Sequence, residues 1–160
     1  MKFGKSLLLL CFFTFSLQAN PCVPHLFSVG AGYWDAGSNH SGGLFQAEYK
    51  WGGYFCRCIR PQVEIMTAEF HSVFVGIGAA IELYLTDHIV FCPNFSPGLY
   101  YGGKGKNLGY PIEFRSALEI AYEFSCKARF GVQFYHISNA HLSHKNPGAN
   151  AITGYLGFPL

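Results

Sequence analysis

The stretch KARFGVQFYHIS, residues 127–138, alternates in hydrophobicity with a period of two. Its even positions from Ala128 to Phe134 carry apolar side chains, and the odd positions include Lys127, Arg129 and Gln133. Successive side chains of a β-strand point to opposite faces of the sheet. The stretch therefore predicts a strand with one apolar face and one polar face.

The same alternation recurs along the chain and predicts an all-β protein. We expect eight strands, over 26–35, 43–51, 60–68, 72–85, 88–101, 112–124, 127–138 and 150–160. Several reach the roughly 9–11 residues that a tilted strand needs to cross a membrane. Short connections at 86–87 and 125–126 contrast with longer ones at 36–42, 102–111 and 139–149. This pattern is typical of an eight-stranded antiparallel up-and-down transmembrane β-barrel.

Composition narrows the choice among barrels. Of the 160 residues, 18% are aromatic and only 12% are charged, which excludes an intrinsically disordered chain. The alternative is a soluble barrel of the lipocalin type with its apolar face turned inward. That alternative is disfavoured because the few charges would leave a poorly soluble exterior. The near balance of charge, with 11 basic and 9 acidic residues, argues against a nucleic-acid partner.

The N-terminus has the pattern of a secretory signal. A basic start with Lys2 and Lys5 precedes an apolar run over residues 7–15 and a small residue, Ala19. That run is too short for a transmembrane helix. We expect residues 1–19 to form a signal peptide and residues 20–160 to form one barrel domain in the outer membrane of a Gram-negative bacterium.

Three polar residues break the apolar face of the last two strands. His136 and Ser138 continue the even, outward positions of their strand, and Asn150 does the same on the final strand. Polar groups on a membrane-facing surface are costly and suggest a function. Ser138 is the candidate nucleophile, His136 its base and Asn150 the residue that orients the imidazole. The alternative is that these are ordinary polar residues at the membrane interface.

The C-terminal 25 residues carry a more specific signal. The run His136-x-Ser138-Asn139-Ala140, followed by Asn146-x-Gly148 and a final strand, resembles the lipid A 3-O-deacylases of Gram-negative outer membranes. The resemblance implies an eight-stranded barrel and a cofactor-free esterase that hydrolyses a hydroxyacyl ester of lipid A. It also implies a His, Ser and Glu triad on the outer surface, beside the outer-membrane lipids.

The sequence departs from this family at one catalytic position. Asn150 stands where the family has Glu, so it can orient His136 but cannot neutralise an imidazolium. Asp35, which has outward parity on the first strand, is the candidate for a rescuing carboxylate. Asn139 and Asn146 are candidate donors to the oxyanion. We expect lipid A or lipopolysaccharide as substrate and neither cofactor nor metal, and whether the chain forms a homodimer stays open.

A second function class fits the same fold. A non-enzymatic outer-membrane barrel, structural or adhesive, would carry the same polar residues at its rim without using them for catalysis. The two classes are distinguished by whether activity depends on Ser138.

Overall fold

The computed structural model describes residues 23–53 and 58–160, so the expected signal peptide lies outside the described residues. One 3₁₀ turn, η1 (Glu69–His71), accompanies the strands. The strands are β1 (Leu26–Trp34), β2 (Gly42–Lys50), β3 (Ile59–Ala68), β4 (Ser72–Ile81), β5 (Leu83–Tyr84), β6 (Ile89–Tyr101), β7 (Ile112–Glu123), β8 (Arg129–Ser138) and β9 (Ala149–Pro159). The described residues contain no helix long and apolar enough to cross a membrane.

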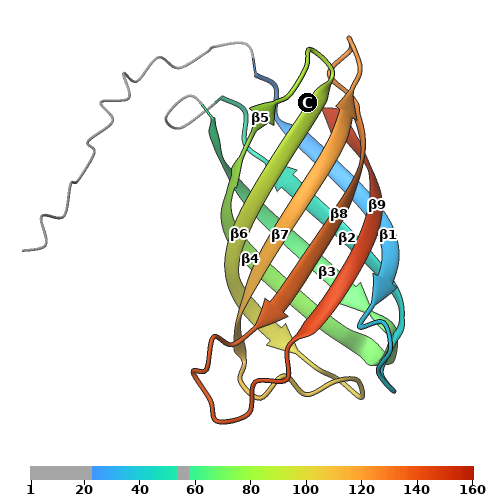
Figure 1. Ribbon diagram of the computed structural model, residues 1–160, viewed down its shortest axis with the longest axis vertical. Coiled ribbons are helices and arrows are strands. Elements are labelled where there is room, and N and C mark those ends of the chain that lie inside the picture. Colours follow the sequence, from blue (N-terminus) through green and yellow to red (C-terminus); the bar gives the residue numbers. More distant parts are fainter. Residues whose placement is uncertain (1–22, 54–57) are drawn as a thin grey trace, which may run out of the picture.

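The strands form one closed antiparallel barrel (Figure 1). Apart from β4 and β5, which both pair with β6, each strand pairs with its neighbour in sequence, and β1 pairs with β9 to join the two ends of the sheet. β4 and β5 share one register against β6 on either side of Glu82. They therefore make up the single strand expected over 72–85, and the prediction of an eight-stranded up-and-down barrel is confirmed.

The two faces of the barrel carry the residues that the alternation assigns to them. Large apolar side chains such as Phe130, Phe134 and Leu118 are about half exposed on the outside. Charged side chains such as Arg115 and Glu119 are almost fully buried inside. An outward apolar surface around a polar interior is the arrangement of a membrane barrel, in which lipid covers the exposed face.

Many of the buried charges pair with one another within the barrel, although the buried Glu113 carboxylate has no such partner among the described residues. Arg115 donates to Gln133 at 2.7 Å and to Asn94 at 2.8 Å, and it lies 3.3 Å from the Glu64 carboxylate. The Lys50 ammonium lies 2.7 Å from Glu119. Because a buried charge is costly unless it is paired, this network lets polar side chains fill the interior.

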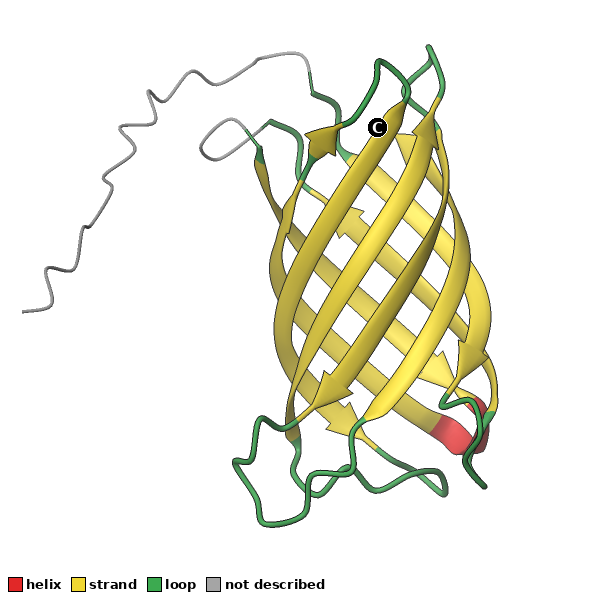
Figure 2. Cartoon of the chain, viewed as in Figure 1, coloured by secondary structure: helices red, strands yellow, loops and turns green. Residues whose placement is uncertain are grey.

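The connections differ at the two ends of the barrel (Figures 1 and 2). The end opposite the C-terminus carries the long connections after β1, β6 and β8, together with η1. The other end carries the C-terminus and the short turns before β6 and β8. We call the first end the long-loop end. The candidate site lies there.

Candidate active site

Cross-strand pairing places the predicted residues on neighbouring strands of the outer face. His136 on β8 lies directly opposite Asn150 on β9 and, on its other side, opposite Ser116 on β7. Ser138 lies two residues further along β8, opposite Phe114. The structure thus forms an outward polar row, Ser116–His136–Asn150, next to the rim of the long-loop end.

The His136 ring is oriented by Asn150. Nδ1 of His136 lies 2.8 Å from Oδ1 of Asn150. Because an amide oxygen only accepts hydrogen bonds, Nδ1 must carry the proton. The other ring nitrogen, Nε2, is then left with a free lone pair, which is the state that a general base requires.

Gly148 keeps the space at Nε2 open. A Cβ atom at this glycine would lie 2.6 Å from Cε1 and 2.9 Å from Nε2 of His136. The glycine also has a φ of +59°, in the left-handed region that side chains disfavour. A residue with a side chain at this position would therefore crowd the basic nitrogen.

Ser138 shares the outward face with His136. Consecutive residues of one face lie about 6.6 Å apart along a strand, and Ser138 is half-buried at the end of β8. Within the described part of the chain, its hydroxyl makes no hydrogen bond to His136. Catalytic hydrogen bonds are often long in free enzymes and tighten when substrate binds.

The Asn139 side chain links the 102–111 and 139–148 loops by hydrogen bonds and is not directed toward an oxyanion. It is fully buried, and Nδ2 donates to the carbonyl oxygens of Leu108 and Lys145, both at 2.9 Å. The expectation of an oxyanion donor at Asn139 therefore needs correction, because both amide hydrogens are already used. Asn146 accepts from the Asn139 N–H at 3.1 Å, and its Nδ2 lies 3.5 Å from Nδ1 of His141.

Asp35 does not supply a carboxylate to His136. It adopts a φ of +49°, which ends the alternation of β1 and turns the side chain into a buried position. There its Oδ1 and Oδ2 lie 2.9 Å and 2.7 Å from the Lys106 ammonium. The inference from strand parity is corrected by this backbone turn. The Asp35 main chain still reaches the site, because its N–H donates to the Asn150 carbonyl at 2.7 Å.

Comparisons with known proteins identify the family. The family model "Lipid A 3-O-deacylase (PagL)" matches residues 26–159. The chain belongs to this family. It is an outer-membrane β-barrel enzyme of the PagL type, as the sequence pattern predicts. No curated protein sequence matches it significantly.

Solved structures support the fold assignment. The crystal structure of the outer membrane enzyme PagL superposes with a TM-score of 0.65 at 18% identity, covering 84% of this chain and 99% of that one. Neisserial surface protein A gives 0.63 at 10% identity, covering 85% and 97%. A de novo designed transmembrane β-barrel gives 0.60 at 7% identity, covering 86% and 95%. At these identities the likeness shows a shared fold.

Apolar rows lie directly below the polar row of this PagL-family barrel. Leu118, Phe134 and Ile152 face each other across β7, β8 and β9 and are 53%, 52% and 55% exposed. In the next row, Gly154 has open space where a side chain would stand. The outer face therefore changes from polar at the rim to apolar within a single step of the pleat.

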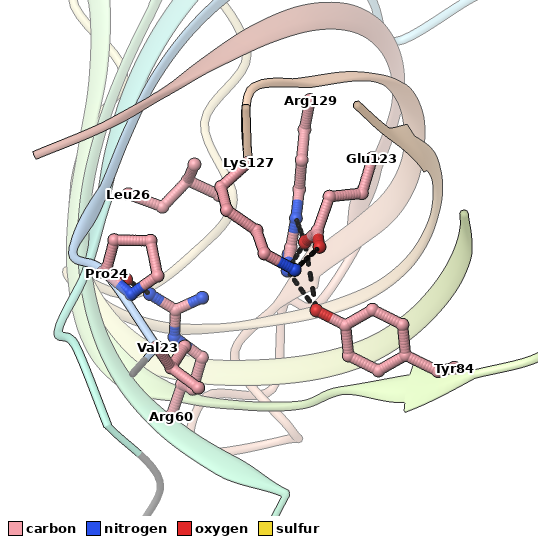
Figure 3. Close-up of a pocket in the computed structure, with 8 residues that line it drawn as sticks. All are labelled: Val23, Pro24, Leu26, Arg60, Tyr84, Glu123, Lys127 and Arg129. Atoms are coloured by element: carbon pink, nitrogen blue, oxygen red, sulfur yellow. Dashed lines mark hydrogen bonds and ion pairs between the residues drawn. The ribbon is translucent and has the colours of Figure 1, made fainter. Parts of the chain in front are cut away.

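A pocket of about 30 Å³ lies at the opposite end of the barrel (Figure 3). Tyr84 donates to Glu123 at 2.9 Å, and Arg129 and Lys127 each lie 2.7 Å from that carboxylate. The hydrogen bond from Lys127 to Glu123 raises the pKa of the Lys127 ammonium. These groups pair with one another, and the pocket contains none of the predicted catalytic residues.

Sequence reasoning missed roles for Ser116, Gly148 and Lys106. Ser116 is a small polar residue in a run of outward apolar positions, and the short turn at 125–126 fixes the register that sets it opposite His136. Gly148 belongs to the motif that indicated the family, but only the geometry shows its contact with the ring. Lys106 lies in a loop, where no periodicity predicts its partner.

Proposed function

We propose that the chain hydrolyses the 3-O-linked hydroxyacyl ester of lipid A by nucleophilic catalysis on the outer face of the barrel. Ser138 attacks the ester carbonyl, and His136 Nε2 takes the hydroxyl proton. The same imidazole then protonates the departing sugar oxygen, leaving an acyl-enzyme. Water activated by His136 releases the fatty acid and restores Ser138.

The hydrogen bond between His136 and Asn150 carries this proposal. Its length of 2.8 Å supports a fixed imidazole tautomer whose free nitrogen lies beside Gly148. An orienting group of this kind is what separates a catalytic histidine from a polar residue at a membrane interface.

The outer face supports a membrane-embedded substrate. Acyl chains would pack on the row formed by Leu118, Phe134 and Ile152, as lipid does. The ester would then reach the polar row above, and the sugar would lie at the rim. This placement explains why an esterase site occupies the outside of a barrel whose interior is filled.

Asn146 and main-chain N–H groups near Gly148 are the proposed donors to the oxyanion. Oδ1 of Asn146 is held by the Asn139 N–H, whereas its Nδ2 makes only a long contact, 3.5 Å, to His141, which leaves this N–H group available to a developing charge. Each well-placed donor contributes a factor of about 10²–10³ to the rate.

The decisive test is Ser138→Ala. Wild-type and variant barrels are expressed in a Gram-negative host, and extracted lipid A is compared by mass spectrometry. Loss of one hydroxyacyl mass with the wild type only is the expected result, with both proteins showing heat-modifiable migration on gels as evidence of folding. Deacylation by a folded Ser138→Ala variant would rule out this nucleophile, and no deacylation by either protein would favour the non-enzymatic barrel.

A further inference from the structure

The ion pair between Asp35 and Lys106 joins two connections that are far apart in the sequence. Asp35 follows β1, and Lys106 lies in the loop between β6 and β7. The side chains of the pair are only 8% and 19% exposed. Such a pair is less screened by water than a surface ion pair.

Both partners of this pair are also held through their main chains. The Lys106 carbonyl accepts a hydrogen bond from Tyr100 at 2.9 Å. The Asp35 N–H donates to the Asn150 carbonyl at 2.7 Å. Because both backbones are anchored, the ion pair forms with little loss of conformational freedom.

The Asp35–Asn150 hydrogen bond lies at the end of the β1–β9 pairing, the seam that closes the barrel. The last paired residues of that ladder are Trp34 and Ala151, so Asp35 and Asn150 form one bond beyond it. Strand ends fray unless something holds them. Asn150 is also the residue whose side chain binds His136, so fraying here would leave Asn150 held by β8 alone and loosen its hold on the imidazole.

We propose that the Asp35–Lys106 ion pair is a positioning element for catalysis. It holds the Asp35 main chain against Asn150, and thereby keeps Asn150 in place to orient His136. Neither charged group touches the ester. This inference rests on the proposed function for its kinetic consequence, whereas the state of the His136 ring can be measured without any substrate.

The kinetic test removes either partner of the pair. Lys106→Met and Asp35→Asn are each expected to lower kcat by about 10- to 100-fold, the cost of a small misplacement of a catalytic group, with little change in KM. Lys106→Arg, which keeps the pair, should retain activity. Lys127→Met is the matched control, because it removes an ion pair of 2.7 Å at the opposite end of the barrel.

The same two variants separate positioning from direct binding of a substrate phosphate. If Lys106 bound phosphate, Lys106→Met would raise KM, while Asp35→Asn would leave KM unchanged or lower it. Similar kcat losses in both variants support positioning, and divergent KM values overturn it.

A double-mutant cycle and a spectroscopic measurement complete the test. In an Asn150→Ala background, Lys106→Met should cost no further activity, because the pair acts through Asn150. ¹⁵N NMR of histidine-labelled barrels in micelles should show His136 protonated at Nδ1 in the wild type and a mixture of tautomers in Lys106→Met. An unchanged tautomer in that folded variant would refute the proposal even if the wild type proved inactive on lipid A.

Discussion

Replacing Asn150 by Asp tests how much the missing negative charge costs. The two side chains have the same shape, so the contact of 2.8 Å to His136 Nδ1 should persist with a carboxylate oxygen in place of the amide oxygen. In the proposed mechanism His136 becomes an imidazolium in the transition state. A negative charge beside it is therefore stabilising there and nearly neutral in the ground state.

The distance between the carboxylate and the imidazolium sets the size of the expected increase in kcat/KM. Unit charges about 4 Å apart attract by about 1 kcal/mol in water and about 4 kcal/mol at the effective dielectric of a protein surface. At about 1.4 kcal/mol per tenfold change, Asn150→Asp should raise kcat/KM by at least about fivefold, with an upper bound of several hundredfold. An acidic residue close to the membrane interface costs about 0–1 kcal/mol of stability, so the variant should fold.

The assay measures fatty-acid release from lipid A by purified barrels in detergent micelles. Asn150→Ala is the control for lost orientation and should be slower than the wild type. Asn150→Glu, the residue of the family, should also be faster than Asn150→Gln, which has the same length without the charge. A folded Asn150→Asp enzyme with activity at or below that of the wild type would refute the reasoning, because no imidazolium would then limit the rate.

Three further changes test the surroundings of the site. Gly148→Ala should nearly abolish deacylation, because its methyl group would lie 2.6 Å from the His136 ring, while Gly37→Ala, at φ +86° with nothing nearby, should be fully active in the same assay. Asn139→Ala removes one buried and one part-buried hydrogen bond, worth about 1 kcal/mol each, and limited proteolysis should cut the 139–148 loop faster than in the wild type. Arg115→Met leaves the Glu64 carboxylate without its cation and should lower the free energy of unfolding by about 3–5 kcal/mol in urea titrations, a result contradicted by an unchanged midpoint.

The alternation of side chains was sufficient to predict the barrel and the face on which each strand residue lies. His136 and Asn150 are on the outside because they keep the parity of Phe134 and Ile152. Once the β8–β9 hairpin fixes the register, their contact follows. The interruption between β4 and β5 at Glu82 did not alter the predicted number of strands in the barrel, because the register against β6 is the same on both sides of it.

The alternation of side chains did not predict the direction of side chains just beyond the ends of the strands. Asp35 takes a left-handed backbone conformation, which nothing in a period of two can anticipate, and so its carboxylate turned away from the predicted partner. Asn139 is one residue beyond β8 and is buried by two loops that pack on it. The contacts that loops make depend on which distant segments of the chain come together, and such contacts leave no periodic signal in the sequence.

The pairing of β1 with β9 makes the activity of the enzyme depend on closure of the barrel. It joins the two ends of the described chain, and the last strand carries Asn150 while the first supplies its main-chain partner. In a chain that has not yet closed, the β8–β9 pairing alone holds Asn150 beside His136, and Asn150 lacks its main-chain hydrogen bond from Asp35. Deacylation should therefore reach its full rate only when β1 and β9 pair, so that an increase in the rate of fatty-acid release would mark the closure of a refolding barrel.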